Sequence, residues 1–90
     1  MIPCYYAHAT HSAKFSKGSV VINGSSRTVR IYSEDRRRVV ELNSTTFDTD
    51  GNCLHVVGYQ QHGGGLTFTL QRWLLVFTAK DARKEERRLS

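Results

Sequence analysis

The fold class is decided by Gly63-Gly64-Gly65-Leu66-Thr67-Phe68-Thr69-Leu70-Gln71-Arg72-Trp73, in which a glycine triplet precedes strict alternation of apolar and polar residues. A period of two is typical of a β-strand that buries one face. We therefore expect Leu66, Phe68 and Leu70 to face a core, with the intervening polar side chains on the opposite face. At the end of the segment, we expect Arg72 on a polar surface near Arg38 and Tyr59, and Trp73 in the core.

Other stretches carry the same kind of signal. β-branched or alternating residues predict strands over residues 19–22, 27–32, 38–42 and 53–59, separated by turn-forming residues. Within these strands Val29 and Ile31 are expected to face inward, and Val40 and Leu42 are expected to share one face, with Val39 and Glu41 on the other. Residues 43–52 are expected to form a polar connection. The apolar run 73–77 is expected to form a short last strand or a single turn that plugs a barrel.

The two ends of the chain differ from this centre. Residues 1–17 show no clean period, so we expect an irregular arm with one short strand at most. Residues 79–90 are nearly all charged helix formers, which predicts a basic C-terminal helix capped by Thr78. With residues 18–78 as the core, the chain is expected to be one domain. That domain is mainly β, a small antiparallel barrel of five or six strands or a strongly bent sheet, with a short charged helix.

Composition limits the classes of function. The chain of 90 residues carries 13 Lys and Arg against 8 acids, a net charge of +5 that favours polyanions or acidic protein surfaces as partners. Without an apolar stretch long enough to cross a membrane or a leader-like N-terminus, we expect a cytoplasmic protein that makes no membrane contact. Cys4 and Cys53 are too few for a disulfide framework and are expected to be reduced thiols.

The basic residues fall into three groups, and two tyrosines accompany them. Lys and Arg neutralise phosphates, and Arg and Tyr also stack on exposed bases. The candidate nucleic-acid-binding residues are Arg30, Tyr32, Arg36, Arg37, Arg38, Tyr59, Arg72, Arg83, Lys84 and Arg87. The alternative is a solvated charged face, in which Asp81, Glu85 and Glu86 pair with neighbouring cations of the terminal helix.

Chemical sites receive less support. The residues Cys4, His8, His11, Cys53, His55 and His62 lack the spacing of a structural zinc site, so we expect no metal and no cofactor. Cys53 and His55 would share a strand face, as any i, i+2 pair does, and this does not define a nucleophile and its base. The glycine triplet leads into a strand, unlike a phosphate-binding loop, which leads into a helix. We therefore expect no enzymatic activity.

Four segments, covering about half of the chain, resemble the strands of the WYL domain: Val29-Arg30-Ile31-Tyr32, Arg38-Val39-Val40-Glu41, Leu54-His55-Val56-Val57-Gly58-Tyr59 and Leu66-Thr67-Phe68-Thr69-Leu70-Gln71-Arg72-Trp73. The resemblance implies an Sm- or SH3-like small β-barrel. It also implies a groove for nucleic acids or nucleotides lined by Tyr32, Arg38, Tyr59 and Arg72. Glu41 replaces a common proline, Gln71 replaces an acid, and no helix-turn-helix precedes the barrel, so a transcription factor is not implied.

The sequence thus predicts a non-catalytic binding module that contacts nucleic acid through an Arg/Tyr surface. The alternative is a small protein-interaction module or inhibitor, of the kind encoded by phages or mobile elements, that docks on a protein partner. A third hypothesis is a homodimer in which unpaired strand edges meet across a two-fold axis.

Overall fold

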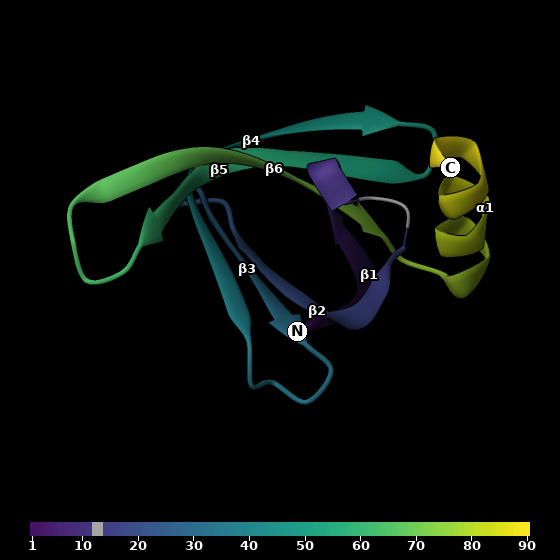
Figure 1. The fold of residues 1–90 in the computed structure, drawn as a ribbon, viewed down its shortest axis with the longest axis horizontal. Helices are drawn as coiled ribbons and strands as arrows, with labels where there is room; N and C mark the ends of the chain where they lie inside the picture. Colours follow the sequence, from purple (N-terminus) through teal and green to yellow (C-terminus); the bar gives the residue numbers. More distant parts are fainter. Residues whose placement is uncertain (12–13) are drawn as a thin grey trace.

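Six antiparallel strands close into a barrel in which each strand pairs with the next along the chain and β6 returns to β1 (Figure 1). The computed structural model describes residues 1–11 and 14–90. The strands are β1 (Ile2–His8), β2 (Ser16–Asn23), β3 (Thr28–Ser33), β4 (Val39–Asp50), β5 (Cys53–His62) and β6 (Thr67–Val76). The short 3-10 helix η1 (Ala9–His11) follows β1, and the helix α1 (Ala79–Leu89) follows β6. The predicted fold class, a mainly β antiparallel barrel with a short C-terminal helix, is confirmed.

The barrel core contains side chains from all of the strands. Its fully buried members are Cys4, Val20, Val29, Ile31, Leu42, Val56 and Leu75. The inward orientation predicted for Val29 and Ile31 is confirmed, and Val40 and Leu42 share a face as predicted, because both pack in this core cluster. Trp73 is partly buried against this core, as predicted.

The N-terminal segment is a barrel strand, so the expectation of an irregular arm is wrong. β1 pairs with β2 through Ile2–Tyr6 and with β6 through Tyr5–His8, and it thereby closes the barrel. The strand lacks apolar/polar alternation because it packs apolar atoms on both faces. Cys4 faces the barrel core, whereas Ala7 belongs to a second cluster outside the barrel.

β4 continues through the region expected to be a polar connection. A bulge between Asn43 and Thr46 bends the strand, and Ser44 there adopts a positive φ of 51°. The backbone N–H and Oγ1 of Thr45 both donate to the carbonyl of Arg27, at 3.0 and 2.9 Å. Beyond the bulge β4 pairs with β5 alone and is exposed to solvent. The backbone pairing with β5 makes this segment a strand, and the exposure accounts for its polar side chains.

β6 unites two segments that the sequence treats separately. The alternating segment and the apolar run form one continuous strand, so the expectation of a separate strand or plug is wrong. Its last residues, Leu74, Leu75 and Val76, are all buried. Leu75 faces the barrel core, whereas Leu74 and Val76 face the cluster that includes Ala82 of α1, so both faces of this end are apolar.

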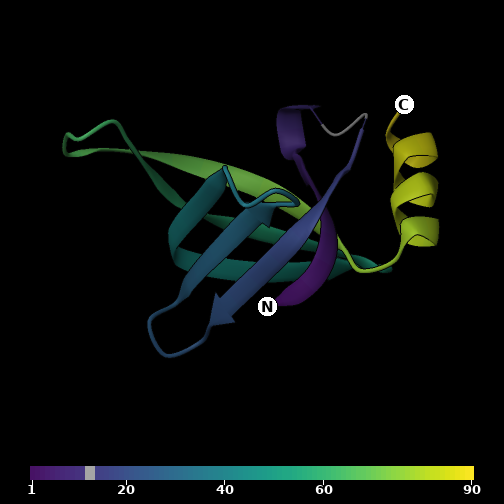
Figure 2. The same cartoon turned by 90° about the horizontal axis from the view of Figure 1, so that it is seen from below.

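The other end of β6 projects away from the barrel with β5 (Figures 1 and 2). We call residues 59–71 the β5–β6 arm. Leu66, Phe68 and Leu70 are exposed there, at 92, 49 and 57%, so their predicted burial is wrong. The alternation is real, but these residues lie on the face of β6 opposite the core-facing Trp73 and Leu75, and no second layer among the described residues covers that face of the arm.

α1 lies at the end of the molecule opposite the tip of the arm (Figures 1 and 2). The helix begins as predicted, because Thr78 accepts a 3.1 Å hydrogen bond from the N–H of Asp81 through its Oγ1. It covers the outer face of the barrel, where a second buried cluster contains Ala7, Phe15, Cys53, Leu74, Val76 and Ala82.

Candidate nucleic-acid interface

The inward face of α1 carries acidic side chains as well as apolar ones. Ala82 and Glu85 are buried against the barrel, at 5 and 7% exposure. The Oε2 of Glu86 accepts a 2.6 Å hydrogen bond from the backbone N–H of Phe15. The Glu86 carboxylate therefore holds the helix on the barrel, and the Glu85 carboxylate is buried on the same side of the helix.

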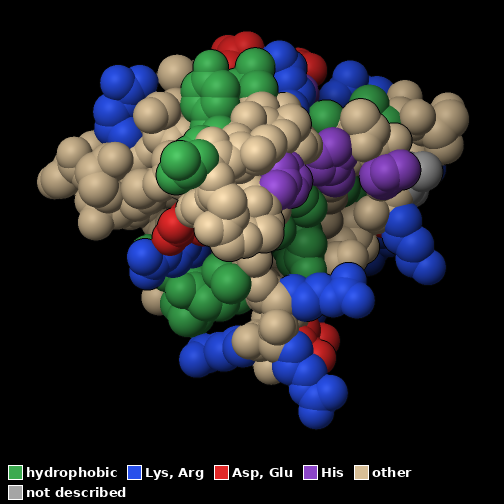
Figure 3. All heavy atoms as spheres, turned by 60° about the vertical axis from the view of Figure 1, so that its left-hand side comes forward, with side chains coloured by type: hydrophobic (Ala, Val, Ile, Leu, Met, Phe, Trp, Pro, Cys, Tyr) green, Lys and Arg blue, Asp and Glu red, His purple; other side chains and the backbone are tan. Residues whose placement is uncertain are grey.

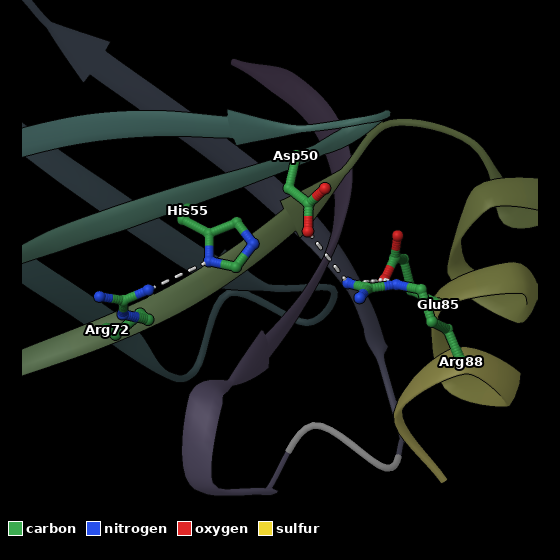
Figure 4. Close-up of polar contacts among 5 residues, drawn as sticks. All are labelled: Asp50, His55, Arg72, Glu85 and Arg88. Atoms are coloured by element: carbon green, nitrogen blue, oxygen red, sulfur yellow. Dashed lines mark hydrogen bonds and ion pairs between the residues drawn. The ribbon is translucent and has the colours of Figure 1, made fainter.

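The C-terminal turn of α1 adds an ion-pair cluster that reaches β4 (Figure 4). Nη2 of Arg88 lies 2.7 Å from Oε2 of Glu85 and 3.6 Å from Oδ2 of Asp50. The hydrogen bond and charge of Glu85 raise the pKa of the Arg88 guanidinium. Arg88 is thus balanced by acids and contributes little free positive charge.

The outward face of α1 is entirely basic. Lys80, Arg83, Lys84 and Arg87 follow the spacing i, i+3, i+4, i+7 and lie on one side of the helix, opposite Ala82 and Glu85. We call these four residues the basic stripe. All four are exposed, and among the described residues no ion pair or hydrogen bond engages their side chains.

Of the ion pairs expected between acids and cations of the terminal helix, the described part of the chain forms one, between Glu85 and Arg88, and Arg88 lies outside the stripe. Lys80 completes the stripe but is absent from the residues predicted for binding. Its helical spacing from Arg83 and Arg87 was the available signal. The sequence therefore identified most of this surface, but not that the helix acids turn away from it.

The turn between β3 and β4 presents Arg36, Arg37 and Arg38, all exposed. Acids of the same turn lie beside them. Asp35 accepts hydrogen bonds from the N–H of Arg37 at 3.0 Å and from the hydroxyl of Ser33 at 2.7 Å, and these hold the pKa of its carboxyl below the usual value. The turn is consequently a mixed-charge surface.

Arg30 and Tyr32 share the outer face of β3, as predicted from alternation. Nε of Arg30 lies 2.6 Å from Oε1 of Glu41 on β4, and this hydrogen bond raises the pKa of the guanidinium. Arg30 and Glu41 line a shallow polar hollow together with Val21, Asn23, Ser26, Thr28 and Asn43. Arg30 is therefore already paired within its own sheet.

Tyr59 and Arg72 lie on the outer face of β5 and β6. Tyr59 pairs with Leu70 and Val57 pairs with Arg72, so the two predicted site residues are diagonal neighbours. Nη1 of Arg72 lies 3.5 Å from Nδ1 of His55 (Figure 4), and among the described residues Arg72 forms no ion pair.

The predicted proximity of Arg72 to Arg38 is wrong. Arg38 precedes β4, and the strand runs five residues further before Asn43 pairs with Tyr59, a span of about 16 Å. Of the residues predicted for one groove, Tyr59 and Arg72 therefore lie together, and Arg38 lies apart from them. On the face shown in Figure 3, Lys and Arg side chains stand apart around the margin and form no continuous patch.

The cysteines and histidines are also dispersed. Cys4 lies in the barrel core and Cys53 in the cluster under α1. Burial raises the pKa of each thiol to about 11, which keeps Cys53 protonated beside His55. Nε2 of His8 contacts Oε1 of Gln71. The imidazole ring of His8 is nearly perpendicular to the indole ring of Trp73, with 4.9 Å between the ring centroids. In the described part of the chain, no three His, Cys, Asp or Glu side chains come together as metal ligands would.

No family model, curated protein or solved structure matches this chain. The resemblance to the WYL domain therefore stays a prediction. In the described ranges, no helix has the length and apolar character needed to cross a membrane.

Proposed function

We propose that this protein is a non-catalytic module that binds nucleic acid through phosphate contacts made by the basic stripe. The observation that carries the proposal is the segregation of charge on α1. Glu85 and Glu86 are held against the barrel, while Lys80, Arg83, Lys84 and Arg87 point outward without acidic partners among the described residues. Such a surface attracts a polyanion more strongly than the net charge alone would.

The dimensions of the stripe suit a nucleic acid backbone. From residue 80 to residue 87 the helix rises about 10 Å, a length over which double-stranded DNA presents about six phosphates. The proposed contacts are made by Lys and Arg with phosphates, and phosphate contacts carry no sequence information. Binding is therefore expected to be independent of sequence.

The turn arginines and the pair formed by Tyr59 and Arg72 are not required by this proposal. They lie on other surfaces, and Asp35 accompanies the turn. They provide the matched comparison that the test needs, because the turn carries the same type of charge in a different place.

The test measures fluorescence anisotropy of a labelled duplex with two double variants. Lys84→Ala with Arg87→Ala removes two charges from the stripe, and Arg36→Ala with Arg37→Ala removes two from the turn. Alanine preserves helix propensity at exposed positions. Losing two phosphate contacts weakens binding roughly 10- to 100-fold at low salt, whereas the turn variant is expected to stay within about threefold of the unmodified protein.

Two results would overturn the proposal. One is the absence of any anisotropy change with duplex or single-stranded nucleic acid at low salt. The other is equal loss of affinity in both double variants, which would show that diffuse net charge, and not the stripe, is responsible.

A further inference from the structure

Among residues 1–11 and 14–90, the β5–β6 arm has a strand edge that pairs with no other strand. β1 pairs with β6 only from Trp73 to Val76, so along Thr67–Arg72 the strand pairs with β5 on one side alone. The unpaired side presents a row of backbone N–H and C=O groups. Such a row is a template for another strand.

The composition of this edge is unusual for an unprotected strand. Residues 59–71 contain no Asp, Glu, Lys or Arg, in a chain whose net charge is +5. Another edge without a partner in the described residues, in β4 beyond its bulge, carries Asp48 and Asp50. Charged side chains of this kind block edge-to-edge association, and β6 has none before Arg72. Two copies of a basic chain therefore repel each other least at the arm.

The arm also exposes apolar side chains on one face. Tyr59, Leu66, Phe68 and Leu70 are 45, 92, 49 and 57% exposed. Tyr59 and Leu70 are directly cross-strand, and Phe68 follows on the same face opposite Gln61. A two-stranded ribbon is marginally stable in water without a further strand. The arm has the properties of an interface whose second half is missing.

We propose that a second copy of this chain pairs with the arm, β6 to β6, antiparallel across a two-fold axis. The strand is self-complementary when Thr69 lies opposite Thr69 of the partner subunit. Phe68 then lies opposite Leu70 of the partner subunit, and the threonines and Gln71 share the other face. The result is one sheet that runs from β4 of one protomer to β4 of its partner.

This dimer does not depend on the proposed function. It uses the end of the molecule away from α1, so both basic stripes stay exposed (Figure 1). Two stripes in one particle would bind a long polyanion more tightly than one stripe does.

Light scattering after gel filtration tests the proposal with matched variants. Thr69→Lys places a charge on the proposed edge, and Thr49→Lys makes the same change on the exposed second half of β4. Edge pairing buries a small interface, so the dimer is expected to be weak and the measurement uses a protein concentration of about 100 µM. At this concentration the unmodified protein is expected to have twice the mass of one chain. Thr69→Lys is expected to have the mass of one chain, and Thr49→Lys that of two. A single-chain mass for the unmodified protein, or a dimer that persists in Thr69→Lys, would overturn the proposal.

Cross-linking tests the register. Cα atoms of directly opposed antiparallel residues are about 4.5–5.5 Å apart, within reach of a disulfide. The native Cys4 and Cys53 thiols are buried with pKa values of about 11 and should stay unreactive. Mild oxidation is expected to convert Thr69→Cys to a covalent dimer and to leave Thr49→Cys largely uncoupled. Equal rates of coupling in the two variants would contradict the symmetric pairing at Thr69.

Discussion

The backbone N–H of Phe15 donates a 2.6 Å hydrogen bond to Oε2 of Glu86. This bond joins the residue before β2 to α1, and it directs the Glu86 carboxylate toward the barrel. The buried Glu85 pairs with Arg88 of the same helix, and Arg88 also contacts Asp50 at the end of β4. The docking of the helix and the one-signed charge of its outer face therefore have a common origin.

Replacing Glu86 by Ala is expected to lower the free energy of unfolding by about 1.5–3 kcal/mol, because the part-buried Phe15 N–H loses a charged acceptor. Urea denaturation measures the change. Glu86→Gln retains a carbonyl acceptor and should recover part of the loss, whereas Lys80→Ala, on the exposed face, should have little effect. If Glu86→Ala unfolds at the same urea concentration as the unmodified protein, the contact does not hold the helix.

Gly18 is expected to resist substitution because β1, β2 and β3 approach closely there. A Cβ at this position would overlap the carbonyl oxygen of Tyr32 and lie 2.8 Å from Cε1 of Tyr6. Gly18→Ala should destabilise the barrel by about 1–3 kcal/mol or more, since a backbone atom cannot move aside as a side chain can. Gly64→Ala is the control, because nothing lies within 4 Å of a Cβ there. Equal thermal midpoints for the two variants would contradict the packing described.

Stability is expected to fall as the pH rises from 9 to 11. Burial raises the pKa of Cys4 and Cys53 from 9.0 to about 11, so over this interval the unfolded chain releases thiol protons that the folded chain retains. The stabilising contribution is fully present below the unfolded pKa and is lost as the pH passes the folded one. The difference between urea midpoints at about pH 8 and pH 10 should be smaller for Cys4→Ala with Cys53→Ala. An undiminished difference would assign the alkaline loss to other groups.

The strands with one buried face were predictable from the sequence. Val29 and Ile31 alternate with polar residues because β3 has the core on one side and an open outer face on the other. β1 and the end of β6 do not show this alternation, because both of their faces pack against apolar side chains. The second half of β4 does not show this alternation either, because the segment is exposed and pairs with β5 only.

In the β5–β6 arm, by contrast, the alternation is present but the predicted burial is not. Phe68 and Leu70 alternate as buried residues do, yet the structure leaves them exposed, because alternation identifies a strand and not what covers it. The candidate site was also predictable only in part. The spacing of Arg83, Lys84 and Arg87 predicts that they share one helix face. The spacing does not predict that Glu85 and Glu86 form contacts elsewhere, which leaves this face without acidic partners in the described structure.

The salt dependence of nucleic acid binding tests the central claim most directly. If the four cations of the basic stripe each neutralise one phosphate of a duplex, log Kd against log salt has a slope of magnitude about 3–4. Replacing all four cations by Ala should abolish binding at low salt while circular dichroism and the urea midpoint stay close to those of the unmodified protein. A quadruple variant that folds and still binds the duplex with the original slope would contradict the account.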